Sequence, residues 1–192
     1  MSDARVTLAL VANASAPRRA AAALFPEAEL CLLERADMRP VRPFYGPLFD
    51  VLALRPPGAC LGIVVPIRLV DHALAPPGGP ALLAVADHVN LELRGPLSGR
   101  WPEGMARAFP ALTGVYQPAA VRARGGPRVY SSGVVAGVGD AERLTPFEVG
   151  AVQESACGAV SDTLVPAAII AAYCGLTLAA CGVLRANDRD EE

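Results

Sequence analysis

The 192-residue sequence contains no lysine, so all 17 of its basic residues are arginines. Chemistry that requires a lysine amine, such as Schiff-base formation, is therefore excluded. The formal net charge is only −2, which gives no electrostatic reason to expect binding to nucleic acid. The five cysteines form no CxxC pair and lack the spacing of a zinc site. We therefore expect free thiols in apolar surroundings, and neither a metal nor another cofactor.

A long apolar run is also missing near residue 1, where Asp3 lies among the first five residues. We expect no signal peptide and a cytoplasmic location. One later segment, Val165 to Leu184, carries no charge over its whole length. Pro166 can open a helix there and Gly175 can end it, which leaves a buried strand after the glycine. We therefore expect a helix and a strand in this segment and no membrane span.

Apolar runs alternate with helix-like segments, which predicts an α/β domain with a mixed sheet. We expect one domain over residues 1–186 and a polar tail over residues 187–192. The predicted strands are Arg5–Ala12, Glu29–Leu33, Ala59–Val65, Ala81–Asp87, Val129–Gly137 and Thr177–Leu184. The predicted helices are Ala16–Leu24, Leu48–Leu54, Thr145–Ala156 with Thr145 and Glu148 as a capping box, and one from Pro166 towards Gly175. The last four strands should share one sheet with helices on both faces.

Within this pattern, the apolar run from Ala81 to Ala86 leads directly into Asp87, His88 and Asn90. Ligand sites in α/β sheets collect at the carboxyl ends of strands, so these polar side chains lie where a binding site is expected. The same side chains could instead only tie the strand end to the loop that follows. Spacing alone favours this structural role.

Several short motifs follow one another in a fixed order from this point. They are Asp87–Leu91, Gly95–Leu97, Ala108–Leu112, Val115-Tyr116, Val135–Gly137, Thr145–Val149, Val165-Pro166, Ile169–Ala171 and Cys174–Leu176. The ordered set resembles the trimeric class of the purine nucleoside phosphorylase family over about the C-terminal two thirds of the chain, in a shortened and divergent form. The resemblance implies a three-layer fold with a central mixed β-sheet flanked by helices. It also implies a pentosyltransferase that cleaves the N-glycosidic bond of purine nucleosides with phosphate.

The resemblance assigns the phosphate site to Ser15, to Arg35 or Arg39 depending on the alignment, and to Ile67. The chain departs from the family pattern at each of these places. The turn around Ser15 has no glycine, no histidine lies near either arginine, and Pro66 supplies no amide hydrogen.

The purine-binding residues implied by the resemblance are also altered. Leu144 stands where the family has a glutamate, and Glu142 could replace it only if the loop shifts. Ser132 falls near the position of the tyrosine that closes the family's pocket. Asn187 is the nearest match, one residue out of register, to the family's purine-contacting asparagine, and so is the candidate catalytic residue.

On the ribose side, Asp162 and Thr163 match the segment that meets the sugar. The Asp162 carboxylate could bind ribose hydroxyls or could stabilise the start of the following helix, and both alternatives stay open. His88 is a further candidate for substrate binding. Met105 matches the region from which the family sends an aromatic side chain into the neighbouring subunit.

Two interpretations of function remain. The retained residues favour an enzyme that acts on a nucleoside or a related N-glycoside with phosphate. The altered residues favour a non-catalytic structural or regulatory homologue that assembles with itself or with an active phosphorylase. In both cases we expect a homo-oligomer, with a trimer as the leading hypothesis and with residues Trp101–Phe109 at the subunit contact.

Overall fold

The computed structural model describes residues 6–33, 47–70, 82–92, 95–97, 109–122 and 129–184. Strands and helices alternate along this part of the chain. The strands are β1 (Leu8–Ala12), β2 (Glu29–Leu33), β3 (Cys60–Leu69), β4 (Leu82–Asn90), β5 (Val129–Gly137), β6 (Ala159–Ser161) and β7 (Thr177–Leu184). The helices are α1 (Ser15–Leu24), α2 (Pro47–Ala53), α3 (Pro118–Arg122), α4 (Pro146–Glu154) and α5 (Leu164–Tyr173). The chain is thus a mixed α/β protein.

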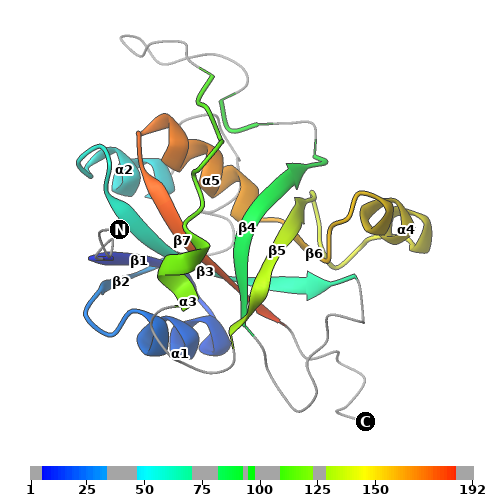
Figure 1. Cartoon of the computed structure of the whole chain (residues 1–192), viewed down its shortest axis with the longest axis horizontal. Helices are drawn as coiled ribbons and strands as arrows, with labels where there is room; N and C mark the ends of the chain where they lie inside the picture. Colours follow the sequence, from blue (N-terminus) through cyan, green and yellow to red (C-terminus); the bar gives the residue numbers. More distant parts are fainter. Residues whose placement is uncertain are drawn as a thin grey trace.

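The strands in the described ranges form one mixed sheet in the order β2-β1-β3-β6-β5-β4-β7 (Figure 1). Strand β7 pairs with β4 in antiparallel orientation and also with β3 in parallel orientation. The pairings that lead from β3 through β6, β5, β4 and β7 therefore return to β3. The prediction that the four later strands share one sheet is confirmed.

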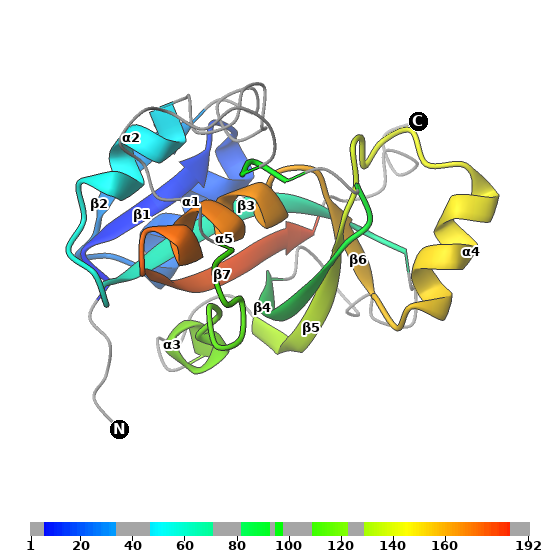
Figure 2. The ribbon, with the colours of Figure 1, turned by 90° about the horizontal axis from the view of Figure 1, so that it is seen from above.

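Side chains that alternate along the strands enter two different apolar clusters. In β1, Leu8 and Leu10 belong to a cluster that includes residues of α2 and α5. Their neighbours Ala9 and Val11 belong to a second cluster with residues of α1 and α3. Since successive side chains of a strand point to opposite faces, apolar residues pack on both faces of the sheet. Helix α4 lies apart from the other helices, beyond β6 (Figure 2).

Strands β2, β5 and β7 have the predicted bounds, whereas β1, β3, β4 and β6 differ from the prediction. Strand β1 begins at Leu8, later than the predicted start at Arg5. The sequence predicts that the third strand ends at Val65, but β3 continues to Leu69 because Pro66 and Ile67 pair with β7 and Arg68 pairs with β6. The sequence does not predict β6. It has only three residues, and its position depends on pairing with both β3 and β5.

The uncharged segment near the end of the chain divides as predicted into helix α5 and strand β7. Helix α5 begins two residues before Pro166, which is compatible with a proline because the first amides of a helix have no partner within it. Gly175 follows the helix with φ of +72°, a conformation that favours glycine. Across the described ranges, we find no helix of the length and hydropathy that a membrane span requires.

Helix α4 begins as the sequence predicts. The Glu148 amide donates to Thr145 Oγ1 over 3.3 Å, and the Thr145 amide donates to Glu148 Oε2 over 2.7 Å. This reciprocal capping box, followed by Pro146 in the first turn, fixes where the helix starts. The helix ends at Glu154, two residues before the predicted end. Its start matters for the site below because Glu148 lines a cavity.

Candidate functional site

Three parallel strands end together at one edge of the sheet. Strands β4, β5 and β6 run parallel to one another. The Leu91 amide donates to the Gly137 carbonyl over 3.0 Å, and the Val138 amide donates to the Ser161 carbonyl over 3.1 Å. These bonds hold the three carboxyl ends side by side. We call this edge, from Leu91 through Val138 to Thr163, the strand-end site.

The expected polar cluster after β4 lies inside the strand instead. Asp87, His88 and Asn90 pair with residues of β5, so the prediction that the strand ends at Asp87 is wrong. The pairing continues because β5 is long enough to bond the whole segment, across two irregularities in register. Asp87 Oδ1 accepts a hydrogen bond from the His88 amide over 2.8 Å, and Asn90 Oδ1 accepts one from the Glu92 amide over 3.2 Å. These local bonds favour a structural role for both side chains.

His88 is half-buried and contacts Tyr116, which lies before helix α3. His88 Nδ1 and the Tyr116 hydroxyl are 2.9 Å apart, and the two rings meet edge to face. Burial raises the pKa of the Tyr116 hydroxyl, which is therefore neutral. The pair joins β4 to the segment that leads into α3. The sequence indicates that both residues belong to shared motifs but does not indicate that they touch.

We expect His88 to make the protein less stable in mild acid. Burial lowers the pKa of His88, and the smaller opposing effect of Asp87 does not cancel this shift. The unfolded chain therefore binds a proton more readily than the folded chain, so stability should fall as pH decreases through about 6.5. Urea denaturation between pH 7.5 and 5 should show a smaller loss of stability for His88→Gln than for the unchanged chain. Equal losses for both proteins would contradict this expectation.

At the β6 end of the site, Ser161, Asp162 and Thr163 are all buried. Ser161 Oγ accepts hydrogen bonds from the amides of Thr163 over 3.3 Å and Leu164 over 3.2 Å. It also lies 3.3 Å from Thr163 Oγ1. Two amides at the start of α5 are therefore already occupied by a side chain of the protein. Ser161 is not among the predicted site residues, although a serine just before a helix is a common capping residue.

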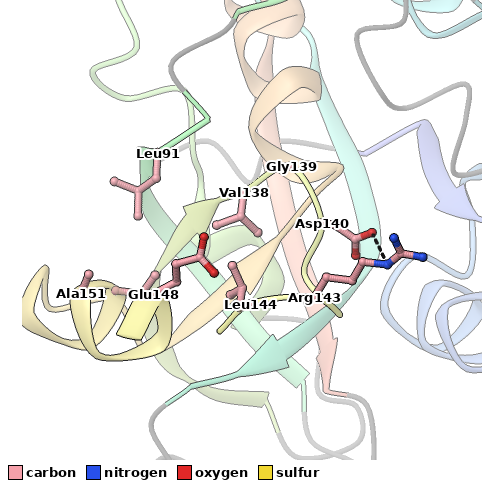
Figure 3. Close-up of a pocket in the computed structure, with 9 residues that line it drawn as sticks. Leu91, Val138, Gly139, Asp140, Arg143, Leu144, Glu148 and Ala151 are labelled. Carbon is pink, nitrogen blue, oxygen red and sulfur yellow. Dashed lines mark ion pairs between the residues drawn. The ribbon is translucent and has the colours of Figure 1, made fainter. Parts of the chain in front are cut away.

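Beside the strand-end site is a cavity of about 380 Å³ between the β4 and β5 ends and helix α4 (Figure 3). Most of its lining is apolar and comes from Leu91, Val138, Leu144, Ala151 and Val152. Leu144, which the resemblance places at the purine, thus borders an open space. Asp162 and Thr163 follow β6, whose last residue is bonded to Val138, so all three matched residues belong to neighbouring strand ends or loops.

The polar residues of the cavity are mainly acidic. Asp140 and Glu148 contribute carboxylates, and Arg143 is the cation among the lining residues. Arg143 Nε lies 3.8 Å from Asp140 Oδ2, and the Arg143 side chain is 86% exposed. Hydrogen bonds from the Thr145 backbone, and then from its side chain, lower the pKa of Glu148, which is therefore ionised at neutral pH.

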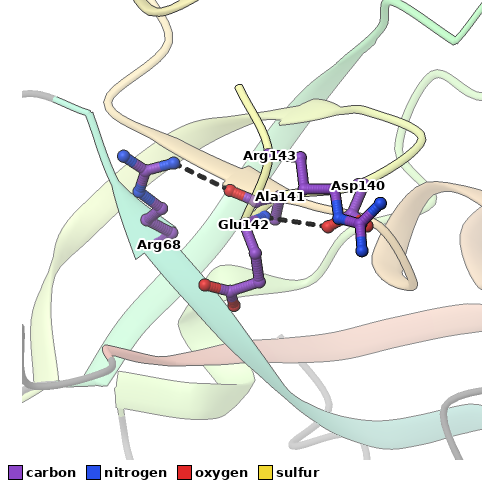
Figure 4. A network of polar contacts seen from close by, with 5 residues as sticks. All are labelled: Arg68, Asp140, Ala141, Glu142 and Arg143. Atoms are coloured by element: carbon purple, nitrogen blue, oxygen red, sulfur yellow. Dashed lines mark hydrogen bonds and ion pairs between the residues drawn. The ribbon is translucent and has the colours of Figure 1, made fainter. Parts of the chain in front are cut away.

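The loop between β5 and α4 is bonded to β3 by Arg68, which is not among the predicted site residues. Arg68 Nη1 donates to the Ala141 carbonyl over 3.0 Å (Figure 4). In the same loop the Glu142 amide donates to Asp140 Oδ1 over 3.0 Å. Glu142 itself is exposed and is not among the cavity-lining residues. The role proposed for its carboxylate therefore depends on a shift of this loop.

The other predicted site residues lie elsewhere or outside the described ranges. Ser15 is the exposed first residue of α1, and Ile67 is buried in β3. Ser132 lies within β5. Arg35, Arg39, Met105 and Asn187 lie outside the residues that the structure describes. In the part of the chain that it does describe, no group of histidine, cysteine and acidic residues is arranged to hold a metal ion.

No protein-family model matches the chain, and a search of curated proteins finds no match. Solved structures, by contrast, match it in fold, and they define the chain as an α/β protein with a purine nucleoside phosphorylase-like fold. The purine nucleoside phosphorylase of Schistosoma mansoni with a monocyclic inhibitor matches with a TM-score of 0.51 and 23% identity, covering 69% of this chain and 53% of that protein. A Schistosoma enzyme in complex with hypoxanthine matches with a TM-score of 0.52 and 24% identity, covering 65% of this chain and 47% of that protein.

The chain thus spans about half the length of these phosphorylases. At this identity the likeness shows the fold. It confirms the expected phosphorylase-like α/β fold, which the sequence motifs indicate from Asp87 onwards.

Proposed function

We propose that this chain is a three-layer purine nucleoside phosphorylase-like protein that binds a purine base or nucleoside at its strand-end site. The observation that carries the proposal is the position of Leu144, Asp162 and Thr163. These residues match the family's purine and ribose segments. Leu144 lines the cavity, and Asp162 and Thr163 are buried after β6, whose end is bonded to Val138. The solved relatives in fold include Schistosoma enzymes in complex with hypoxanthine, guanosine and inosine, so a purine is the ligand of choice.

In this proposal each matched residue contacts the same part of the ligand as the family residue that it matches. Leu144 and the apolar residues around it contact the base, while the buried segment of Asp162 and Thr163 lies on the ribose side. Arg35 or Arg39 would bind phosphate, and Asn187 would contact the purine. A protein with all of these functions would be a pentosyltransferase that acts in the cytoplasm.

One specific contact favours a second candidate function, a non-catalytic homologue. The hydroxyl of Ser161 accepts hydrogen bonds from the Leu164 amide, the first of α5, and from the amide of Thr163 just before the helix. Amides at a helix start are good ligands for an anion such as phosphate, and here they already have a partner. A protein that binds a purine without phosphate could serve as a structural or regulatory subunit, in an assembly of its own copies or in one with an active phosphorylase.

Binding of hypoxanthine tests the proposal. The substitution Leu144→Glu should strengthen this binding. A charged hydrogen bond from the ring to a new carboxylate contributes about 1.5–3 kcal/mol, so affinity should rise by about tenfold or more. Isothermal titration calorimetry with hypoxanthine and inosine measures the change. Leu54→Glu, the same substitution at an exposed leucine of another region, is the matched control and should leave affinity unchanged. If neither the unchanged chain nor Leu144→Glu binds a purine, the proposal fails.

We further propose that the chain forms a homo-oligomer, with a trimer favoured and residues 101–109 at the contact. Phe109, at the end of this range, is highly exposed in the single chain, as expected for a side chain that a neighbouring subunit would cover. Light scattering at micromolar concentration should give a mass larger than the 19.8 kDa of one chain, and three times that mass for the favoured trimer. A stable monomer under these conditions would contradict the proposal.

A further inference from the structure

We propose that the cavity beside α4 binds a small organic cation, namely a flat, mostly apolar molecule that carries an amidinium or a similar protonated nitrogen group. This proposal concerns the same cavity against which the proposed function places the purine base, but it is based on the carboxylates of the cavity and not on the family match. The shape of the cavity and the position of the carboxylates around it both favour such a ligand.

The apolar walls suit the body of such a molecule. Leu91 and Val138 follow two neighbouring strands, and Ala151 and Val152 face them from α4. The space of about 380 Å³ is large enough for a substituted aromatic ring. Leu91 is partly exposed. A bound ring would therefore cover apolar surface that now faces solvent, which favours binding.

The charges around these walls select a cation. Figure 3 shows the Glu148 carboxylate directed towards Val138 and Leu144, with Asp140 on the other side of the same space. A third carboxylate, that of Glu92, lies 3.8 Å from where a Cβ on Gly139 would stand. Arg143 is the cation among the lining residues, and it lies against Asp140. The net charge at the cavity is therefore negative, which repels phosphate and attracts a positively charged ligand.

The Glu148 carboxylate is held in a fixed position. Its Oε2 atom accepts hydrogen bonds from the Thr145 amide over 2.7 Å and from the Thr145 hydroxyl over 2.8 Å. These bonds keep the group ionised, because they lower its pKa, and they restrict its rotation. A carboxylate held in this way suits a charge-assisted hydrogen bond with an N–H group of an amidinium.

Three ring compounds of similar size test the inference at neutral pH. Benzamidine carries a positive charge, benzamide is neutral and benzoate is negative. Ligand-observed NMR and calorimetry should show benzamidine binding about tenfold or more tightly than benzamide, because a charge-assisted pair is stronger than a neutral one. Benzoate should not bind. Equal affinity for the three compounds, or no binding of benzamidine, would overturn the inference.

Glu148→Gln is the decisive variant because glutamine also completes a capping box, so helix α4 should stay folded. We expect it to weaken benzamidine binding by about tenfold, since the charge is lost while the shape is kept. Glu154→Gln removes a carboxylate at the other end of the same helix, away from the cavity lining, and should change nothing. Asp140→Asn is a second variant that should also weaken binding. Unchanged affinity in both Glu148→Gln and Asp140→Asn would overturn the inference.

These outcomes can be separated from those of the purine experiment. Benzamidine binding without hypoxanthine binding would leave the cation site in place and remove the proposed function. Hypoxanthine binding without any preference for benzamidine would support the proposed function and remove the cation site.

Discussion

The purified chain, incubated with inosine and phosphate, is expected to release little or no hypoxanthine. Phosphorolysis requires that phosphate leave water and be held by arginine side chains and backbone amides. The segment that resembles the family's phosphate turn has no glycine, and Pro66 provides no amide hydrogen. At the other end of the site, Ser161 already accepts hydrogen bonds from the amide of Thr163, just before α5, and from the first amide of the helix. Phosphate would therefore be held by fewer groups than the reaction needs.

The magnitude of the loss follows from the strength of these contacts. Each lost hydrogen bond to a charged group costs about 1.5–3 kcal/mol, so two losses amount to about 3–6 kcal/mol. Since each 1.36 kcal/mol changes a rate about tenfold, the reaction should be slower by roughly 10²–10⁴-fold. The change at the purine site lowers the rate further, because Leu144 cannot stabilise the leaving base as a carboxylate does. Such losses are not strictly additive, and Asp162 or Glu142 could recover part of them.

Chromatography of hypoxanthine with and without phosphate measures this rate against an authentic purine nucleoside phosphorylase in the same buffer. The unchanged chain should remain at the level of the phosphate-free control. Release at the rate of the authentic enzyme, dependent on phosphate and abolished by Arg35→Ala or Arg39→Ala, would contradict the prediction.

The second large effect concerns stability, and we expect Gly137→Ala to destabilise the protein by about 1–3 kcal/mol, as overpacking in a core usually does. Gly137 is the last residue of β5, where helix α5 begins close to the strand. A Cβ at this position would stand 2.6 Å from Val165 Cγ2 and 2.8 Å from Val165 Cβ. The second contact is close to the helix backbone and cannot be relieved by rotating the side chain. The start of α5 would have to move away from the strand-end site.

Gly150→Ala is the matched control for this change. Gly150 lies within helix α4, and a Cβ there would have no neighbour within 4 Å. Because alanine is a better helix former than glycine, this variant should be more stable by about 0.5–1 kcal/mol. Urea denaturation followed by circular dichroism measures both. Gly137→Ala as stable as the unchanged chain would show that the contact with Val165 does not limit packing.

Local patterns in the sequence were enough to predict most elements of the sheet. The bounds of β2, β5 and β7 agree with the prediction because glycine, proline or charged residues lie near both ends of each strand. The start of α4 agrees because the capping box depends on residues only three positions apart. The phosphorylase-like fold could also be predicted, since the order of the motifs is a property of the sequence itself.

Where the sequence prediction was wrong, pairing between distant segments decided the outcome. Strand β4 continues through His88 and Asn90 because β5 offers it a partner along that length. Strand β3 continues past Pro66 because β7 and β6 lie beside it. Polar residues and proline are weak signals for a strand, and they are tolerated once neighbouring strands bond the backbone on either side.

The sequence by itself determined the kind of fold and the residues that match the purine and ribose segments, because both depend on the order of residues along the chain. The tertiary structure alone decided how these residues are used. It placed the Ser161 hydroxyl against the amides of α5, His88 against Tyr116, and the carboxylates of Asp140 and Glu148 around an apolar cavity. Hydrogen bonds, burial and cavity shape depend on which distant segments meet, and no local pattern specifies that.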